Sequence, residues 1–162
     1  MHNRRVFCTL ALAGLAAACA SPGAVAIPDG TQLIILRHAD RAGDDLNTLG
    51  IARSQALVTA LEGVRIDAIY ARDIQRNLDT AAPLAADRGI GVQVINDMNP
   101  TARLMEAGAG RTIVWVGNKD NLKTIWKTLQ LPGPPPLDYG DLYIAAPSRF
   151  GRPQVDRRRF GP

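Results

Sequence analysis

Apolar residues along this chain occur either in short continuous runs or at helical spacing, which predicts strands that alternate with helices. The most prominent run, Leu33–Leu36, lies within TQLIILRHADR (31–41). A short apolar run bounded by turn-forming and charged residues is typical of a buried strand in the centre of a parallel sheet. Further strands are expected at Ile66–Ala71, Val92–Ile95, Thr112–Val116, Leu142–Ala146 and Pro153–Phe160, the last two antiparallel at the sheet edge.

The segments between these runs have the spacing and the boundary residues of helices. A polar loop, 39–47, precedes a helix whose apolar positions run from Ala52 to Val64, with Thr48 as its expected N-cap. The other expected helices are Ile74–Asp87, a short one around Thr101–Ala107, and one capped by Asn118 or Asp120 that buries Leu122, Ile125, Trp126 and Leu129. This alternation predicts an α/β protein, a three-layer α/β/α sandwich with a mostly parallel central sheet.

The first 26 residues have the pattern of a bacterial signal peptide. Arg4 and Arg5 precede an apolar run, Val6–Ala18, and residues 24–26 (Ala-Val-Ala) form a small-x-small cleavage site. The run is too short to cross a bilayer comfortably as a permanent helix. We therefore expect a signal peptide at 1–26, a folded domain at 27–162, and a periplasmic or secreted protein.

Two variants of this export route stay open. Residues 4–7 weakly resemble a twin-arginine signal, and residues 16–19 resemble an incomplete lipoprotein box, so lipidation at Cys19 would anchor the protein to a membrane. Cleavage after Ala26 would remove Cys8 and Cys19, which are the two cysteines of the chain. Disulfide and cysteine-nucleophile chemistry would then be excluded.

Charge gives little indication of a macromolecular partner. The net charge of +4 falls to about +2 once Arg4 and Arg5 are removed. The C-terminal arginines at 149, 152 and 157–159 fit a solvated edge strand or tail. We expect no nucleic-acid partner, and no membrane partner unless Cys19 is lipidated; the oligomeric state is left open.

Polar residues directly follow the predicted strands. Arg37 and His38 follow the first strand, Asn118 follows Thr112–Val116, and Arg76 lies in the first turn of the helix after Ile66–Ala71. The carboxyl ends of parallel strands share one edge of a sheet, where ligands bind. Two guanidiniums, an imidazole, an amide and a helix N-terminus suit a phosphoryl group, although each residue taken singly also fits an ordinary structural role.

Four segments together resemble the histidine phosphatase superfamily, which has the phosphoglycerate-mutase-like fold. LIILRHADR resembles its Arg-His-Gly signature in an Arg-His-Ala form, and LNTLGIARSQAL resembles the helix that follows. AIYARDIQRNLDTAAPLA matches the next strand and helix, with Arg76 at the arginine position, and TIVWVGNKDNL resembles the Val-Gly-His stretch. The ending, DLYIAAPSRFGRPQVDRRRFG, is similar to the last strands of exported members.

The resemblance implies a mechanism that suits these residue types. His38 would attack phosphorus in line and become a phosphohistidine, which water then hydrolyses. Arg37 and Arg76 would hold the phosphoryl oxygens and balance their charge in the transition state. No cofactor or metal is implied, and the sequence offers no His/Asp/Glu cluster at ligand spacing. The expected ligand is a phosphorylated small molecule or free phosphate.

Asn118 departs from the family pattern, because it occupies the position of a second histidine in the phosphate pocket. An amide can donate a hydrogen bond but supplies neither positive charge nor a proton, and losing one preorganised donor typically costs about 10²–10³ in rate. The general acid is also unassigned: Glu106, Asp120 and Asp40 are nominal candidates, and each fits a surface carboxylate better.

The sequence thus predicts an exported phosphomonoester phosphatase with its nucleophile at His38 and its activity weakened by Asn118. The alternative is a catalytically inactive member that binds phosphate or a phosphorylated ligand through Arg37, His38 and Arg76. A small mutase fits less well, since the chain has no large insertion that could enclose a sugar phosphate. The sequence does not disclose the substrate.

Overall fold

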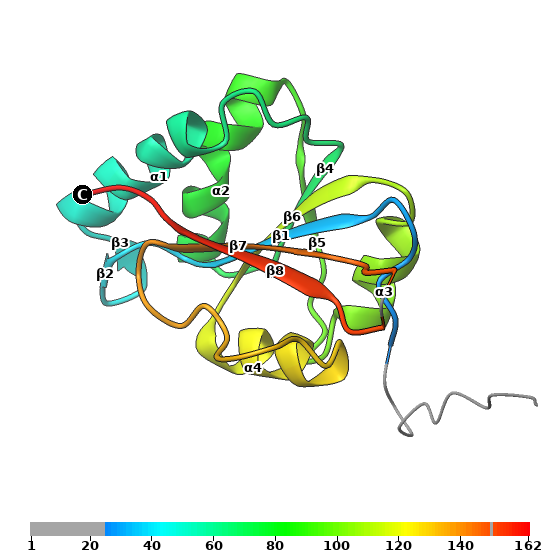
Figure 1. Ribbon diagram of the computed structural model, residues 1–162. Helices are drawn as coiled ribbons and strands as arrows, with labels where there is room; N and C mark the ends of the chain where they lie inside the picture. The colour runs from blue at the N-terminus through cyan, green and yellow to red at the C-terminus, as the bar shows by residue number, and fades with distance from the viewer. Residues whose placement is uncertain (1–24, 150) are drawn as a thin grey trace, which may run out of the picture.

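The computed structural model describes residues 25–149 and 151–162, and it has the predicted three-layer architecture (Figure 1). Most of the expected signal peptide, residues 1–24, lies outside the described residues. Within those two described ranges, no helix is long and apolar enough to cross a membrane.

A six-stranded sheet forms the middle layer, in the order β5-β4-β6-β1-β7-β8. Its strands are β1 (Gln32–Arg37), β4 (Ala68–Ala71), β5 (Val92–Val94), β6 (Thr112–Gly117), β7 (Asp141–Ala146) and β8 (Gln154–Arg159). The strands β5, β4, β6 and β1 are parallel, whereas β7 and β8 are antiparallel to their neighbours. The predictions of a mostly parallel sheet, a central first strand and an antiparallel edge are therefore confirmed.

Two pairs of helices cover the two faces of this sheet (Figure 1). They are α1 (Thr48–Ala60) and α2 (Gln75–Arg88) on one face, and α3 (Thr101–Ala107) and α4 (Lys119–Thr128) on the other. An apolar core lies on each face of the sheet. Alternate residues of β1 pack in one core or the other, because successive side chains of a strand point to opposite faces. Ile34 and Leu36 pack in the core under α1 and α2, and Leu33 and Ile35 in the core under α3 and α4.

The loop after β1 contains a short hairpin that the sequence did not predict, formed by β2 (Arg41–Ala42) and β3 (Asp45–Leu46). The helix α1 then begins with Asn47 as its N-cap, one residue before the expected Thr48, and the Asn47 side chain accepts a hydrogen bond from Gly50 N–H at 2.9 Å. A Cβ atom at Gly50 would lie 1.9 Å from the Asp40 carbonyl oxygen. Only glycine therefore allows α1 to pack this closely on the loop that follows His38.

The buried face of α1 differs from the prediction. Ala52 was expected inside but is exposed, whereas Arg53 and Ser54 are buried beside Leu57. The cause is an ion pair: Arg53 Nε lies 2.6 Å from Asp40 Oδ2, so a charged residue turns toward the protein interior. Apolar spacing alone cannot reveal a buried face that is fixed by such a pair.

Directly after the C-cap of α4, one residue has a left-handed backbone conformation, which residues with a side chain rarely adopt. Gln130 N–H donates to Lys127 O and Leu131 N–H to Trp126 O, which is the double hydrogen bond of a Schellman motif. The residue at its left-handed position is usually glycine, but here it is Gln130 with φ of 52°. A left-handed backbone costs a residue with a side chain about 1–2 kcal/mol.

Candidate functional site

The register between β1 and β6 brings the predicted site residues to one edge of the sheet. Arg37 is paired with Gly117, and the next residue, His38, donates its backbone N–H to Gly117 O at 2.8 Å. The end of β4 is level with them, since Ala71 pairs with Val116. The side chains that follow these three strand ends therefore start from neighbouring backbone positions, as the sequence predicted.

His38 is almost completely buried, with an exposed fraction of 2%. Its Nδ1 lies 2.9 Å from the Ala39 carbonyl oxygen, which can only accept, so Nδ1 carries the ring proton and Nε2 keeps its lone pair. Burial, together with the positive charges of Arg37, Arg76 and Arg41, lowers the pKa of His38 to about 4. The imidazole is thus neutral at physiological pH and its Nε2 is a nucleophile.

Arg37 is held by the segment that leads into β7. Its Nη1 donates to Leu137 O at 3.1 Å, its Nη2 donates to the Tyr139 hydroxyl at 3.0 Å, and its guanidinium carbon lies 3.9 Å from the Tyr139 ring centre. Its Nε, by contrast, is buried without a hydrogen-bond partner in the described residues. Burial lowers the pKa of Arg37, but a guanidinium stays protonated at neutral pH.

Arg76 repeats this arrangement from the first turn of α2. Its Nη1 lies 3.1 Å from Asp44 Oδ1 in the loop between β2 and β3, while its Nε is buried without a partner in the described part of the chain. Thr80 links this turn to the residue after His38, because its hydroxyl donates to Arg76 O at 2.7 Å and accepts Ala39 N–H at 2.9 Å. Arg37 and Arg76 thus each have a buried Nε donor for which the described residues supply no acceptor.

Asn118 is the N-cap of α4, which settles the choice that the sequence left between Asn118 and Asp120. Its side-chain oxygen accepts from Asn121 Nδ2, and its backbone N–H donates to Asn121 Oδ1 at 3.1 Å. Asn121 is fully buried and also accepts from the Trp115 indole at 3.3 Å. This network fixes the Asn118 amide and leaves its NH₂ as the remaining donor.

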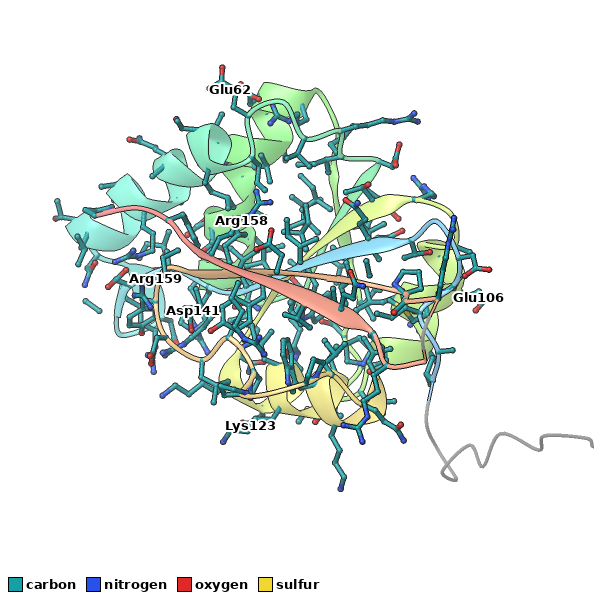
Figure 2. The ribbon with its side chains drawn as sticks, viewed as in Figure 1. Glu62, Glu106, Lys123, Asp141, Arg158 and Arg159 are labelled. Carbon is teal, nitrogen blue, oxygen red and sulfur yellow. The ribbon has the colours of Figure 1, made fainter. Side chains whose placement is uncertain are left out.

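Two of the three nominal proton donors have other positions or partners. Asp40 is bound to Arg53, whose Nη1 also donates to Phe160 O at 2.8 Å, so this buried pair links the His38 loop to the last residues described. Glu106 lies near the amino-terminal end of β1, away from His38 (Figure 2). It is two residues before Gly108, whose carbonyl oxygen accepts a hydrogen bond from the hydroxyl of Thr31, directly before β1. Asp120 is exposed in the first turn of α4.

Sequence reasoning missed three contributors to the site. Arg41 adds a third positive charge that acts on His38, and its place directly after the Arg-His-Ala-Asp run could have indicated this. Tyr139 and the Leu137 carbonyl hold Arg37 across about 100 residues of sequence, and no local pattern signals that contact. Within the described ranges, no group of three or more His, Cys, Asp or Glu side chains could hold a metal ion.

The family model of the histidine phosphatase superfamily (branch 1) matches residues 33–126, which is more than half of the chain. This chain belongs to the histidine phosphatase superfamily. The matched region contains Arg37, His38, Arg76 and Asn118, and it runs from β1 to α4.

The chain is also similar to a mycobacterial protein and to solved structures. The uncharacterized protein Rv0525 of Mycobacterium tuberculosis is 29% identical over an alignment of 147 residues that covers 82% of this chain and 68% of the relative. The protein histidine phosphatase SixA, solved with tungstate, has a TM-score of 0.62 at 18% identity and covers 79% of this chain and 96% of its own. Mycobacterial glucosyl-3-phosphoglycerate phosphatase Rv2419c, solved with inorganic phosphate, has a TM-score of 0.57 at 18% identity, covering 82% and 97%. At these identities the two structures show a shared fold.

The lowered pKa of His38 predicts a pH-dependent stability. Since the ring titrates near 4 in the folded protein and near 6.5 when unfolded, the unfolded state binds more protons between these values. His38 should therefore favour folding fully above pH 6.5, and this contribution should decline as the pH falls from 6.5 toward 4. Urea unfolding of the wild type and of His38→Asn across this range measures it. Parallel profiles for the two proteins would show that the fold does not hold the ring neutral.

Proposed function

We propose that this protein is an exported phosphomonoester phosphatase that forms a phosphohistidine on His38. The observation that carries the proposal is a neutral, buried imidazole with a fixed Nδ1 proton, close to the charges of Arg37, Arg76 and Arg41. Arg37 and Arg76 also have buried Nε donors without a partner in the described residues, as do Arg72 and Arg88, and an anion beside His38 would supply an acceptor for the first two. Inorganic phosphate and tungstate, found in two structures with this fold, are acceptors of that kind.

In this mechanism His38 Nε2 attacks phosphorus, a P–N bond forms, and the P–O bond to the leaving group breaks with its electron pair staying on oxygen. The Nε groups of Arg37 and Arg76 and the Asn118 amide donate to the three other phosphoryl oxygens. Water then attacks phosphorus, the P–N bond breaks, and His38 recovers its lone pair as phosphate and a proton leave.

Protonation of the leaving oxygen is the step for which the side chains of this site are least suited. Asp40 is paired with Arg53, Glu106 lies near the amino-terminal end of β1, and Asn118 has no proton to give. Asp120 or solvent water remains as the proton source. Substrates whose leaving group needs little protonation, such as aryl phosphates, should therefore react faster than alkyl phosphates.

Export is proposed from the sequence of residues 1–26, with lipidation at Cys19 as its alternative. Ile27, the first residue after the expected cleavage site, is 6% exposed in the core under α3 and α4. Val25 also packs against this core and donates its N–H to Thr128 O at 3.0 Å, a contact that cleavage after Ala26 would remove.

A second candidate function is phosphate or phospho-ligand binding without turnover. The observation in its favour is the fixed Asn118 amide, which stands where the family has a histidine and serves as the cap of α4. A pure binding protein, however, does not need a neutral imidazole with its Nε2 lone pair available.

The decisive experiment is to trap the intermediate. Mature protein mixed with ³²P-labelled aryl phosphate and quenched with alkali should carry an acid-labile, alkali-stable phosphoryl group on a peptide that contains His38, and His38→Asn should carry none. A wild-type protein that binds phosphate but never becomes labelled would establish the binding function instead.

Removing Arg76 should abolish most anion binding. Tungstate at 100 times its Kd stabilises a protein by about 2.7 kcal/mol, so the wild-type melting temperature should rise clearly while that of Arg76→Ala rises little. Arg103→Ala is the matched control, because Arg103 forms a solvent-exposed ion pair with Asp97. An equal tungstate shift in Arg76→Ala and wild type would mean that the anion binds elsewhere.

Asn118→His should raise turnover by up to the ~10²–10³ that one transition-state donor contributes, with little change in KM. The same change removes the α4 N-cap, so the free energy of unfolding should fall by about 0.5–2 kcal/mol. Adding His38→Asn should erase the gain in turnover. A folded but inactive Asn118→His protein would favour the binding function, whereas a slower one would show that Asn118 is adapted to its substrate.

A further inference from the structure

A hollow separate from the His38 site lies between α4 and the proline-rich connector at 131–136. It has a volume of about 500 Å³, and its charged lining residues are Lys123, Lys127 and Arg152. A second hollow of about 570 Å³ continues from it and shares Gln130 and Arg152. We propose that this groove binds an extended, acidic segment of a partner protein. The proposal is independent of the reaction at His38.

The charges of the groove have no partner within the described protein. Among the described residues no carboxylate lines the first hollow, one (Asp29) lines the second, and no ion pair holds Lys123, Lys127 or Arg152. Arg158 and Arg159, by contrast, pair with Asp156 and Asp141. Lys123 projects outward from α4 (Figure 2). Lys123 and Lys127 are four residues apart, a spacing at which like charges destabilise a helix. This arrangement is unfavourable for α4 alone and favourable for an anion.

Gln130 gives an independent indication that the groove is used. Among the described residues it is the one non-glycine residue with a positive φ. It lies at a helix end where glycine would fit without strain. Its side chain is exposed and lines both hollows. Strained backbone conformations concentrate at functional sites, and a glutamine amide can bond to both the N–H and the C=O of a peptide backbone.

The shape and chemistry of the groove favour a peptide over other polyanions. Acidic side chains at alternate positions of an extended peptide are about 6.6 Å apart, close to the ~6 Å rise between residues four apart in a helix. Single-stranded nucleic acid typically stacks its bases on exposed aromatic side chains, but Trp126 is 5% exposed and its indole donates to Gly133 O at 2.7 Å. The large exposed apolar side chains that could enter a membrane lie elsewhere in the described chain, at Leu49, Ile51, Val94 and Met98.

The test measures binding of a fluorescein-labelled twelve-residue peptide of alternating Glu and Ala to the full-length chain by anisotropy, since Val25 and Ala26 line the second hollow. Wild type should bind with an affinity that falls as salt rises, and Trp126 emission should change. Lys123→Gln/Lys127→Gln should weaken binding at least tenfold. The control, Arg65→Gln/Arg103→Gln, removes the same net charge from exposed side chains elsewhere and should bind like wild type.

The variant Gln130→Gly distinguishes a loss of peptide binding from a loss of stability. Glycine relieves the left-handed strain, so the melting temperature should rise by about 2–4 °C, while peptide binding should weaken several-fold. Equal binding by the two double variants would overturn the proposal. Tighter binding of a twelve-nucleotide single-stranded DNA, or of vesicles with anionic lipid, at the same salt would also overturn it.

Discussion

The site depends first on the register in which β1 pairs with β6. Arg37 lies opposite Gly117, and His38 N–H donates to Gly117 O. A shift of one residue would turn every β1 side chain to the other face of the sheet, moving Leu33 and Ile35 out of one core and Ile34 and Leu36 out of the other. The packing of β1 between the two apolar cores thereby positions His38 at the end of the strand.

In Arg37 and Arg76, Nη nitrogens have protein partners, whereas the Nε nitrogens have none in the described residues. The Nη nitrogens of Arg37 bind Leu137 O and the Tyr139 hydroxyl, which holds its guanidinium plane, whereas Nη1 of Arg76 binds the exposed Asp44. The Nε atoms keep their hydrogen-bonding capacity. Positive charge therefore surrounds an imidazole that burial keeps neutral, which favours an incoming dianion and leaves the attacking lone pair free.

The sequence was sufficient for the parts of the molecule that follow apolar patterns. The runs at Leu33–Leu36 and Thr112–Val116 are β1 and β6, and the stripe of α4 is buried as predicted. Prediction failed where polar groups decide the packing. The buried face of α1 follows the pairing of Arg53 with Asp40, and the support of Arg37 by Tyr139 joins residues 102 positions apart. Such contacts leave no periodic signal, because they depend on the finished fold.

The strand order also has a consequence for biosynthesis. β1 is the first strand that the ribosome makes, yet its neighbours β6 and β7 begin only at Thr112 and Asp141. At roughly 5–20 residues per second, the nascent chain would carry the apolar segment Leu33–Leu36 for about 4–15 seconds before β6 exists. Unpaired apolar strands associate with one another. Until β6 has been made, the segment Leu33–Leu36 is therefore available for association between nascent copies.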